Sequence, residues 1–100
     1  EVIAEASKYK KPIYITENGL ASIDANLDDK ARQEYIGAIF AQLAKALAYG
    51  ADLRGYFYWS LLDNFEWSSG YTIRFGLHTI DRKPKGSAKF YKDLIKSSCT

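Results

Sequence analysis

Hydrophobic residues recur along the chain at two different intervals, and together they predict an alternation of helices and strands. The first ten residues carry apolar side chains three or four positions apart, typical of a helix that ends before Pro12. Residues 13–16 form a short β-branched and aromatic run, which predicts a buried strand. Gly19 is expected to begin a loop that extends to residue 26.

The longest periodic stretch predicts a helix from about Asp28 to Tyr49. Acidic residues at its start and Gly50 after its end suit the two ends of a helix. Its apolar positions fall on one stripe of helical period: Tyr35, Ile36, Ile39, Phe40, Leu43 and Leu47.

The second half of the chain predicts one more strand and one more helix, separated by a long loop. Residues 55–60 are apolar almost throughout, which indicates a strand covered on both faces, as in a parallel sheet between helices. Residues 61–76 mix polar and aromatic groups and predict a structured loop. Ser87 is expected to cap the final helix, and the charged residues Lys83, Lys85 and Lys89 are expected to form a solvated face. The inner face of that helix would carry Phe90, Tyr91, Leu94 and Ile95.

This order of elements describes two consecutive βα units of an α/β fold. Two parallel strands alone leave apolar edges uncovered, so we expect the chain to be a piece of a larger sheet. The sequence begins at Glu1, contains no methionine and has no segment resembling a signal peptide, which favours a processed or truncated chain.

Composition and charge exclude several classes of protein. With 47% hydrophobic and 26% charged residues, the chain is globular rather than disordered. Its 100 residues are too few for a closed (β/α)₈ barrel, which needs roughly 250. A net charge of +2 predicts no nucleic-acid partner and no membrane partner, and no apolar run approaches the roughly 20 residues of a membrane span. One cysteine, Cys99, and one histidine, His78, predict neither a disulfide framework nor a metal site.

Candidate chemistry lies where each predicted strand ends, which is where functional groups gather in βα units. Glu17 follows the first strand and precedes a glycine turn, so its carboxylate is placed to project into a barrel mouth or crevice. The alternative for an isolated loop carboxylate is a capping contact or an ion pair with a lysine.

A second cluster, Trp59, Asp63, Glu66 and Trp67, follows the second strand. Indole rings stack on the C–H faces of sugars, and carboxylates accept hydrogen bonds from hydroxyl groups. A core tryptophan beside a hydrogen-bonded loop is the alternative explanation. Because both strand ends carry such groups, the pattern favours a polyhydroxylated ligand.

The sequence also resembles a known family. Residues 12–21, PIYITENGLA, are similar to the nucleophile segment of glycoside hydrolase family 1, the β-glucosidase family. Residues 55–67, GYFYWSLLDNFEW, continued by 70–71 and 74–77, resemble its glucose-binding segment, and residues 84–91 resemble the start of its last helix. This resemblance implies that residues 1–100 form the C-terminal part of one (β/α)₈ TIM barrel domain, its seventh and eighth βα units.

The resemblance also implies a role for each candidate residue. Glu17 would be the catalytic nucleophile, and Trp59 the platform beneath the glycone sugar. Glu66 would bind the hydroxyls at C4 and C6, Trp67 the hydroxyl at C3, and Phe75 would line the same subsite. A retaining glycosidase also needs an acid/base carboxylate about 5–5.5 Å from the nucleophile. In this family that glutamate lies in a Thr-Phe/Leu-Asn-Glu-Pro segment, which does not occur here.

The sequence therefore predicts half of an active site. The leading hypothesis is retaining hydrolysis of terminal β-D-glucosidic bonds by a longer protein, with the remainder of the barrel as partner, a β-glucoside as substrate and no cofactor. On this hypothesis the fragment alone is inactive. Glu66 argues against a 6-phosphoglycoside, because its carboxylate would repel a phosphate at C6. The alternative is a non-catalytic sugar-binding or assembly module derived from the same barrel.

Overall fold

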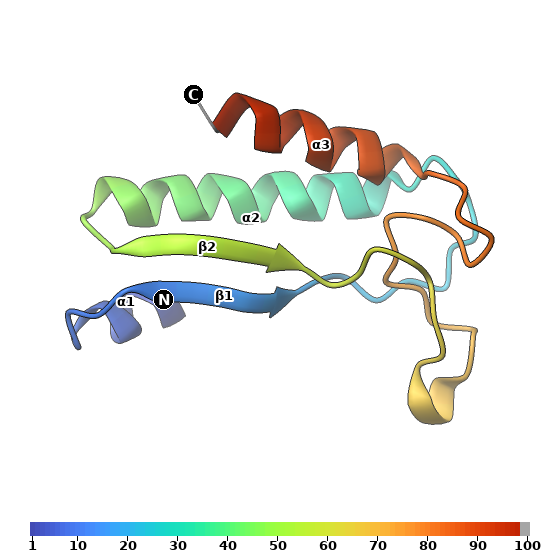
Figure 1. The fold of residues 1–100 in the computed structure, drawn as a ribbon, viewed down its shortest axis with the longest axis horizontal. Coiled ribbons are helices and arrows are strands. Elements are labelled where there is room, and N and C mark those ends of the chain that lie inside the picture. Colours follow the sequence, from blue (N-terminus) through green and yellow to red (C-terminus); the bar gives the residue numbers. More distant parts are fainter. Residues whose placement is uncertain (99–100) are drawn as a thin grey trace.

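The computed structural model describes residues 1–98, so Cys99 lies outside the described part of the chain. Helices α2 and α3 lie side by side over one face of a two-stranded sheet (Figure 1). The predicted order of helices and strands is confirmed. The elements are α1 (Val2–Ser7), β1 (Ile13–Asn18), α2 (Lys30–Ala48), β2 (Leu53–Tyr58), the 3₁₀ helix η1 (Trp67–Ser69) and α3 (Gly86–Ser98).

Strands β1 and β2 pair in parallel, with α2 as the crossover between them. Ile13 lies opposite Leu53, and Asn18 lies opposite Tyr58, so the two carboxyl ends meet at one edge of the sheet. Just beyond that edge, a Cβ atom on Gly19 would collide with the carbonyl oxygen of Trp59. Glycine is therefore required where the chain leaves β1.

The end of α2 confirms the role predicted for Gly50. This residue adopts φ +92°, a left-handed conformation that favours glycine. The Gly50 N–H donates to the Leu47 carbonyl at 3.0 Å, and the Ala51 N–H donates to the Ala46 carbonyl at 3.0 Å. These two bonds form a Schellman motif, which satisfies carbonyls that the helix end would otherwise leave unpaired.

The core lies between the sheet and the two long helices. Ile36 is fully buried on α2, and four aromatic rings from α2, β2 and α3 contact one another. Phe40 makes edge-to-face contacts with Tyr56 and Tyr91, with ring centroids 5.2 Å and 6.0 Å apart. Tyr58 contacts Tyr91 at 5.9 Å. Edge-to-face packing of this kind adds to the stabilisation that burial of the rings already provides.

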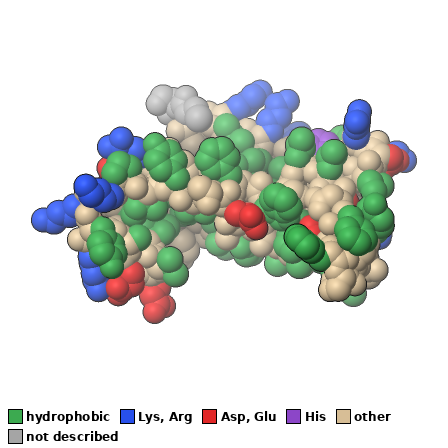
Figure 2. Space-filling model, turned by 60° about the horizontal axis from the view of Figure 1, so that its bottom comes forward, with side chains coloured by type: hydrophobic (Ala, Val, Ile, Leu, Met, Phe, Trp, Pro, Cys, Tyr) green, Lys and Arg blue, Asp and Glu red, His purple; other side chains and the backbone are tan. Residues whose placement is uncertain are grey.

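The opposite face of the sheet is not covered by any of residues 1–98, so the covering predicted for this side of β2 has to come from the rest of the larger sheet. Phe57 is 60% exposed and Trp59 41% exposed, because none of residues 1–98 packs over this side. Figure 2 shows hydrophobic side chains gathered on the side turned away from the helices, with acidic groups among them. We call this side, formed by Tyr14, Thr16, Glu17, Phe57 and Trp59, the open face, and the other side the helix-covered face.

The beginning of α3 corrects a prediction. The helix begins at Gly86, so Ser87 lies inside it rather than at its N-cap. The Ser87 N–H and Oγ both donate to the carboxylate of Asp29, at 2.8 and 2.6 Å. A side chain from the residue before α2 thus caps α3, a contact between residues far apart in sequence.

Candidate active site

Glu17 is positioned by an irregularity in β1. Ile15 pairs with Tyr56 and Asn18 with Tyr58, so β1 advances three residues while β2 advances two. One extra residue on one strand of a pair is a β-bulge, which shifts the alternation of side chains between the two faces.

The bulge determines which face carries the Glu17 carboxylate. Strict alternation would send Glu17 to the helix-covered face, together with the half-buried Ile13 and Ile15. Instead Glu17 is exposed, and Asn18 turns toward the helices, where its Oδ1 accepts a hydrogen bond from the Tyr56 hydroxyl at 2.8 Å. The Glu17 side chain makes no hydrogen bond or ion pair with any other of residues 1–98. Its carboxylate is therefore free to meet a ligand.

Trp59 lies beside this position, directly after β2. Its N–H donates to the Asn18 carbonyl at 2.8 Å, which continues the pairing of the two strands by one residue. The peptide bond between Trp59 and Ser60 is cis. The indole lies on the open face, next to the strand that carries Glu17.

Phe75 returns to the same place from the long loop. Its carbonyl accepts hydrogen bonds from the Ser60 N–H at 3.2 Å and from the Tyr58 hydroxyl at 3.1 Å. Its side chain is half-buried. The structure thus brings three of the five predicted site residues, Glu17, Trp59 and Phe75, to the carboxyl ends of the two strands.

Glu66 and Trp67 lie farther out, on the segment that carries η1 and extends away from the sheet (Figure 1). Trp67 is 85% exposed. The Oε1 atom of Glu66 is buried and has no hydrogen-bond partner among the described residues. A buried carboxylate oxygen without a donor is unfavourable, so this atom is suited to accept a hydrogen bond from a donor outside residues 1–98.

The sequence analysis missed a group of buried charged residues behind the site. Arg32 is 1% exposed, and its Nη1 donates to Asp29 at 2.8 Å. Lys85, predicted to be solvated, is also buried, and it forms an ion pair with Asp63 at 2.8 Å. The sequence could have indicated that Arg32 is buried, because Arg32 lies four residues before Ile36 on the buried stripe of α2. It could not have indicated that Lys85 is buried, because the partner of Lys85 is distant in sequence.

Burial also changes the acidity of the tyrosines on the helix-covered face. It raises the pKa of Tyr56 well above the usual range. Burial likewise raises the pKa of Tyr58, although the Arg32 guanidinium partly opposes this effect. These hydroxyls therefore remain protonated donors to the Asn18 side chain and the Phe75 carbonyl.

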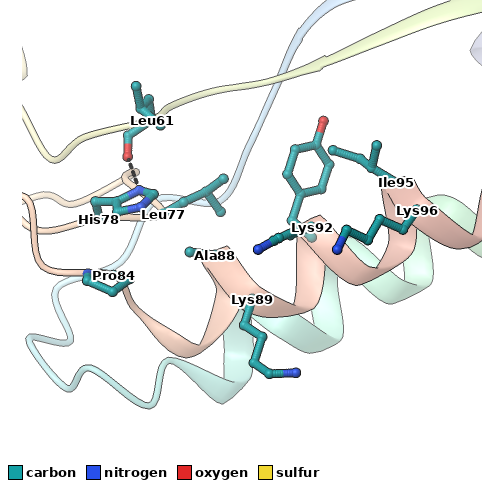
Figure 3. Close-up of a pocket in the computed structure, with 10 residues that line it drawn as sticks. Leu61, Leu77, His78, Pro84, Ala88, Lys89, Lys92, Ile95 and Lys96 are labelled. Carbon is teal, nitrogen blue, oxygen red and sulfur yellow. Dashed lines mark hydrogen bonds between the residues drawn. The ribbon is translucent and has the colours of Figure 1, made fainter.

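A groove lies between the loop after β2 and helix α3, and it contains none of the five predicted site residues. Figure 3 shows Leu61, Leu77 and Ile95 along it, with Lys92 and Lys96 at its border. His78 Nδ1 lies 3.1 Å from the Leu61 carbonyl there. Within residues 1–98 there is no cluster of three metal-ligating His, Cys, Asp or Glu side chains, and no helix long and apolar enough to cross a membrane.

Comparison with known proteins decides the family. The model of glycosyl hydrolase family 1 matches residues 2–99. The chain belongs to glycosyl hydrolase family 1. Beta-glucosidase 42 from Arabidopsis thaliana is 46% identical over 105 aligned positions, which cover 91% of this chain and 21% of that protein. A 6-phospho-beta-galactosidase from Streptococcus equi subsp. zooepidemicus is 48% identical, again over 91% of this chain and 21% of that protein.

Solved structures of similar proteins confirm the fold. A beta-glucosidase from Thermotoga maritima superposes with a TM-score of 0.86 at 37% identity, over 95% of this chain and 24% of that chain. A beta-glycosidase from Pyrococcus horikoshii gives 0.86 at 43% identity, over 95% of this chain and 23% of that one. The two βα units are thus the last two of a family 1 (β/α)₈ barrel and are incomplete by themselves. The chain spans about a fifth of the length of the curated relatives it matches.

Proposed function

We propose that this chain supplies the nucleophile and part of the sugar-binding site of a β-glucosidase that hydrolyses terminal β-D-glucosidic bonds with retention of configuration. The observation that carries the proposal is the bulge in β1, which places the unpaired Glu17 carboxylate on the open face beside Trp59. An ionised carboxylate in that position is suited to attack an anomeric carbon above an aromatic platform.

The reaction proceeds in two steps. In the first, a Glu17 oxygen bonds to the anomeric carbon while the bond to the leaving oxygen breaks, and a second carboxylic acid protonates that oxygen. In the second, the same carboxylate removes a proton from water, and the water oxygen displaces Glu17 from the sugar. This acid/base group comes from another part of the longer protein, because the family's acid/base segment does not occur in residues 1–100.

Glu66 supports a glucoside with a free C6 hydroxyl as the substrate. Its buried, unpartnered Oε1 accepts a hydrogen bond from a sugar hydroxyl, whereas a phosphate at C6 would meet a like charge. Overall similarity does not separate the two substrates, since beta-glucosidases and 6-phospho-beta-galactosidases match this chain at similar identity. Rates with an aryl β-glucoside and its 6-phosphate test this assignment directly, and faster hydrolysis of the phosphate would contradict it.

The decisive experiment traps the covalent intermediate in the full-length protein. A 2-fluoro glucoside with a good leaving group slows the second step, so the glycosyl-enzyme accumulates. Peptide mass spectrometry is expected to place the added sugar on Glu17. In a Glu17→Gly variant, azide should enter the vacated space and yield a glycosyl azide of inverted configuration. A sugar on Asp63 or Glu66, or unimpaired hydrolysis by Glu17→Gly, would overturn the proposal.

The isolated 100-residue chain is expected to show no turnover, because it lacks the acid/base group and exposes the open face. A soluble monomer of this chain that hydrolyses an aryl β-glucoside at an ordinary enzyme rate would contradict the half-site assignment. The competing function is a non-catalytic sugar-binding or assembly module. Sugar binding by the full-length protein without labelling of Glu17 would favour that module.

A further inference from the structure

The segment that carries Glu66 and Trp67 leaves the barrel end after Asp63 and returns at Gly76. We call residues 63–76 the excursion. Hydrogen bonds inside it are local: the Glu66 N–H donates to the Gly70 carbonyl at 2.8 Å, and the Gly70 N–H donates to the Trp67 carbonyl at 3.1 Å. Contacts with the rest of the chain lie toward its ends, and at the second end Arg74 and Ser22 exchange two backbone hydrogen bonds at 2.7 and 2.9 Å. The position of Glu66 relative to the strands therefore depends on how the two ends of the excursion are held.

One carboxylate joins those two ends. Asp63 Oδ1 accepts a hydrogen bond from the Gly76 N–H at 2.8 Å, which bridges the first and last residues of the excursion. The backbone is tightly packed here, because a Cβ atom on Gly76 would collide with the backbone nitrogen of Asp63. The Asp63 N–H in turn donates to the His78 carbonyl at 2.9 Å. Asp63 is thus the closing residue of the excursion.

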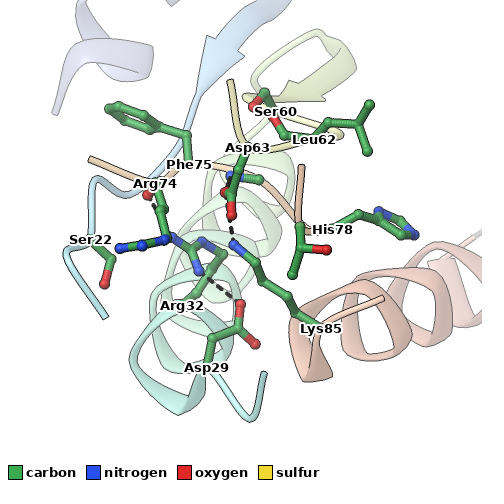
Figure 4. Close-up of polar contacts among 12 residues, drawn as sticks. Ser22, Asp29, Arg32, Ser60, Leu62, Asp63, Arg74, Phe75, His78 and Lys85 are labelled. Atoms are coloured by element: carbon green, nitrogen blue, oxygen red, sulfur yellow. Dashed lines mark hydrogen bonds and ion pairs between the residues drawn. The ribbon is translucent and has the colours of Figure 1, made fainter. Parts of the chain in front are cut away.

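Lys85 fixes this carboxylate from outside the excursion. Its Nζ lies 2.8 Å from the same Asp63 Oδ1, with the two side chains only 3% and 12% exposed. The Lys85 N–H donates to the Leu77 carbonyl at 2.9 Å, and α3 begins at the next residue. Figure 4 shows the lysine reaching from the start of α3 to Asp63, beside the separate pair of Arg32 and Asp29. The pair therefore ties the base of the excursion to a rigid helix.

We infer that Lys85 is a positioning residue that, through Asp63, holds the excursion so that Glu66 reaches the sugar; the inference rests on the function proposed above. A buried ion pair is a poor source of net stability, because removing two charges from water is costly. The role of the Lys85–Asp63 pair here is to fix the position of the Asp63 carboxylate. Only two residues separate Asp63 from Glu66, so a displaced Asp63 carries the Glu66 carboxylate away from its hydroxyl partners.

The inference predicts a loss of sugar discrimination rather than a uniform loss of activity. A β-xyloside lacks the C6 hydroxymethyl group that Glu66 is proposed to bind. In the full-length protein, Lys85→Met should lower kcat/KM for an aryl β-glucoside about tenfold relative to the matching xyloside, the equivalent of roughly 1.4 kcal/mol of transition-state binding. Most of the change should appear in KM. A variant that merely lowers the folded fraction reduces both substrates equally and leaves their ratio unchanged.

Three further measurements make the test specific. Lys89→Met removes an exposed lysine of α3 that pairs with Asp93, and it should leave the ratio at the wild-type value. The double variant Asp63→Asn/Lys85→Met buries no unpaired charge, so it replaces Lys85→Met in the test if that variant does not fold. The double variant should also show a lower ratio of glucoside to xyloside kcat/KM. Labelling of Glu17 by the 2-fluoro glucoside should persist in each folded variant.

The outcomes separate this inference from the proposed function. An unchanged glucoside-to-xyloside ratio in a folded Lys85→Met or double variant overturns the positioning role while leaving the nucleophile assignment intact. Loss of folding in both variants likewise overturns it, because the pair would then serve stability alone. Failure of the wild-type protein to become labelled on Glu17 instead rejects the proposed function itself.

Discussion

The two faces of the sheet are formed by the same two strands, but they differ in packing and in hydrogen bonding. On the helix-covered face, Tyr56 and Tyr58 pack against α2 and α3, and each hydroxyl donates a hydrogen bond. On the open face, Phe57 and Trp59 are substantially exposed, and the Glu17 carboxylate has no partner among residues 1–98. Satisfied polar groups and dense packing stabilise one face, while unsatisfied groups on the other remain available for a ligand.

This difference shows that residues that stabilise a βα unit and residues proposed to bind its ligand can be direct neighbours in the sequence. Neighbouring residues Glu17 and Asn18 belong to opposite faces, and a single extra residue in β1 decides which of them meets the ligand. Substitution of Glu17, at the carboxyl end of β1, should therefore change activity with little effect on folding. Substitutions on the helix-covered face should do the reverse.

The largest effect is expected for Glu17→Gln in the full-length protein. Because the amide is a poor nucleophile, kcat for an aryl β-glucoside should fall by roughly 10⁴-fold or more. The exposed side chain makes no bond within residues 1–98, so the free energy of unfolding should change by less than about 0.5 kcal/mol. Steady-state kinetics and urea denaturation measure the two quantities. A large loss of stability would show that the open face also supports the fold.

The opposite case is Arg32→Met, behind the helix-covered face. The substitution leaves the Asp29 carboxylate, which is 4% exposed, without its cationic partner. Removing one member of a buried pair costs about 3–5 kcal/mol, so the free energy of unfolding of the full-length protein should fall by that amount. Lys30→Met is the matched control: its ammonium is exposed, and its loss should cost less than about 0.5 kcal/mol. Equal stability of the two variants would refute the importance of the buried pair.

An intermediate effect on glucoside hydrolysis is expected for Glu66→Gln, a substitution in the proposed sugar-binding site rather than at the proposed nucleophile. Hydrogen bonds to a charged acceptor are worth roughly 1.5–3 kcal/mol, so kcat/KM for a glucoside should fall about 10- to 100-fold. The unfolding transition should stay close to that of the unsubstituted protein. Unchanged glucoside kinetics would show that Glu66 does not contact the sugar.

The smallest effect concerns alkaline pH. Burial raises the pKa of Tyr56, Tyr58 and Tyr91 in the folded protein, whereas the same side chains ionise near pH 10 when unfolded. The folded state therefore holds more protons above that pH, and stability should decline as pH rises beyond about 10. Tyr56→Phe should reduce this decline, by up to about 1.4 kcal/mol per pH unit for one proton. Urea denaturation at pH 9 and pH 11 measures the difference, and an identical decline in the variant would contradict it.

Local sequence determined the elements of this protein, whereas the candidate site residues were assigned by resemblance to the family. The stripe of apolar residues along α2 predicted a helix that the structure places at Lys30–Ala48, and Gly50 marked its end. The run before Glu17 predicted β1, although the strand extends two residues farther, to Asn18. Such features depend on side chains close together in the chain, so a single sequence is enough to reveal them.

Tertiary structure alone decided which face and which partner each residue has. The register of β1 against β2 created the bulge that turns Glu17 outward, and register depends on a strand distant in sequence. Packing of α3 on α2 gave Ser87 the Asp29 carboxylate as its partner and buried Lys85 against Asp63. These contacts join residues separated by 58 and 22 positions. A local pattern carries no information about such pairings, because their energy arises only when the folded chain removes both groups from water.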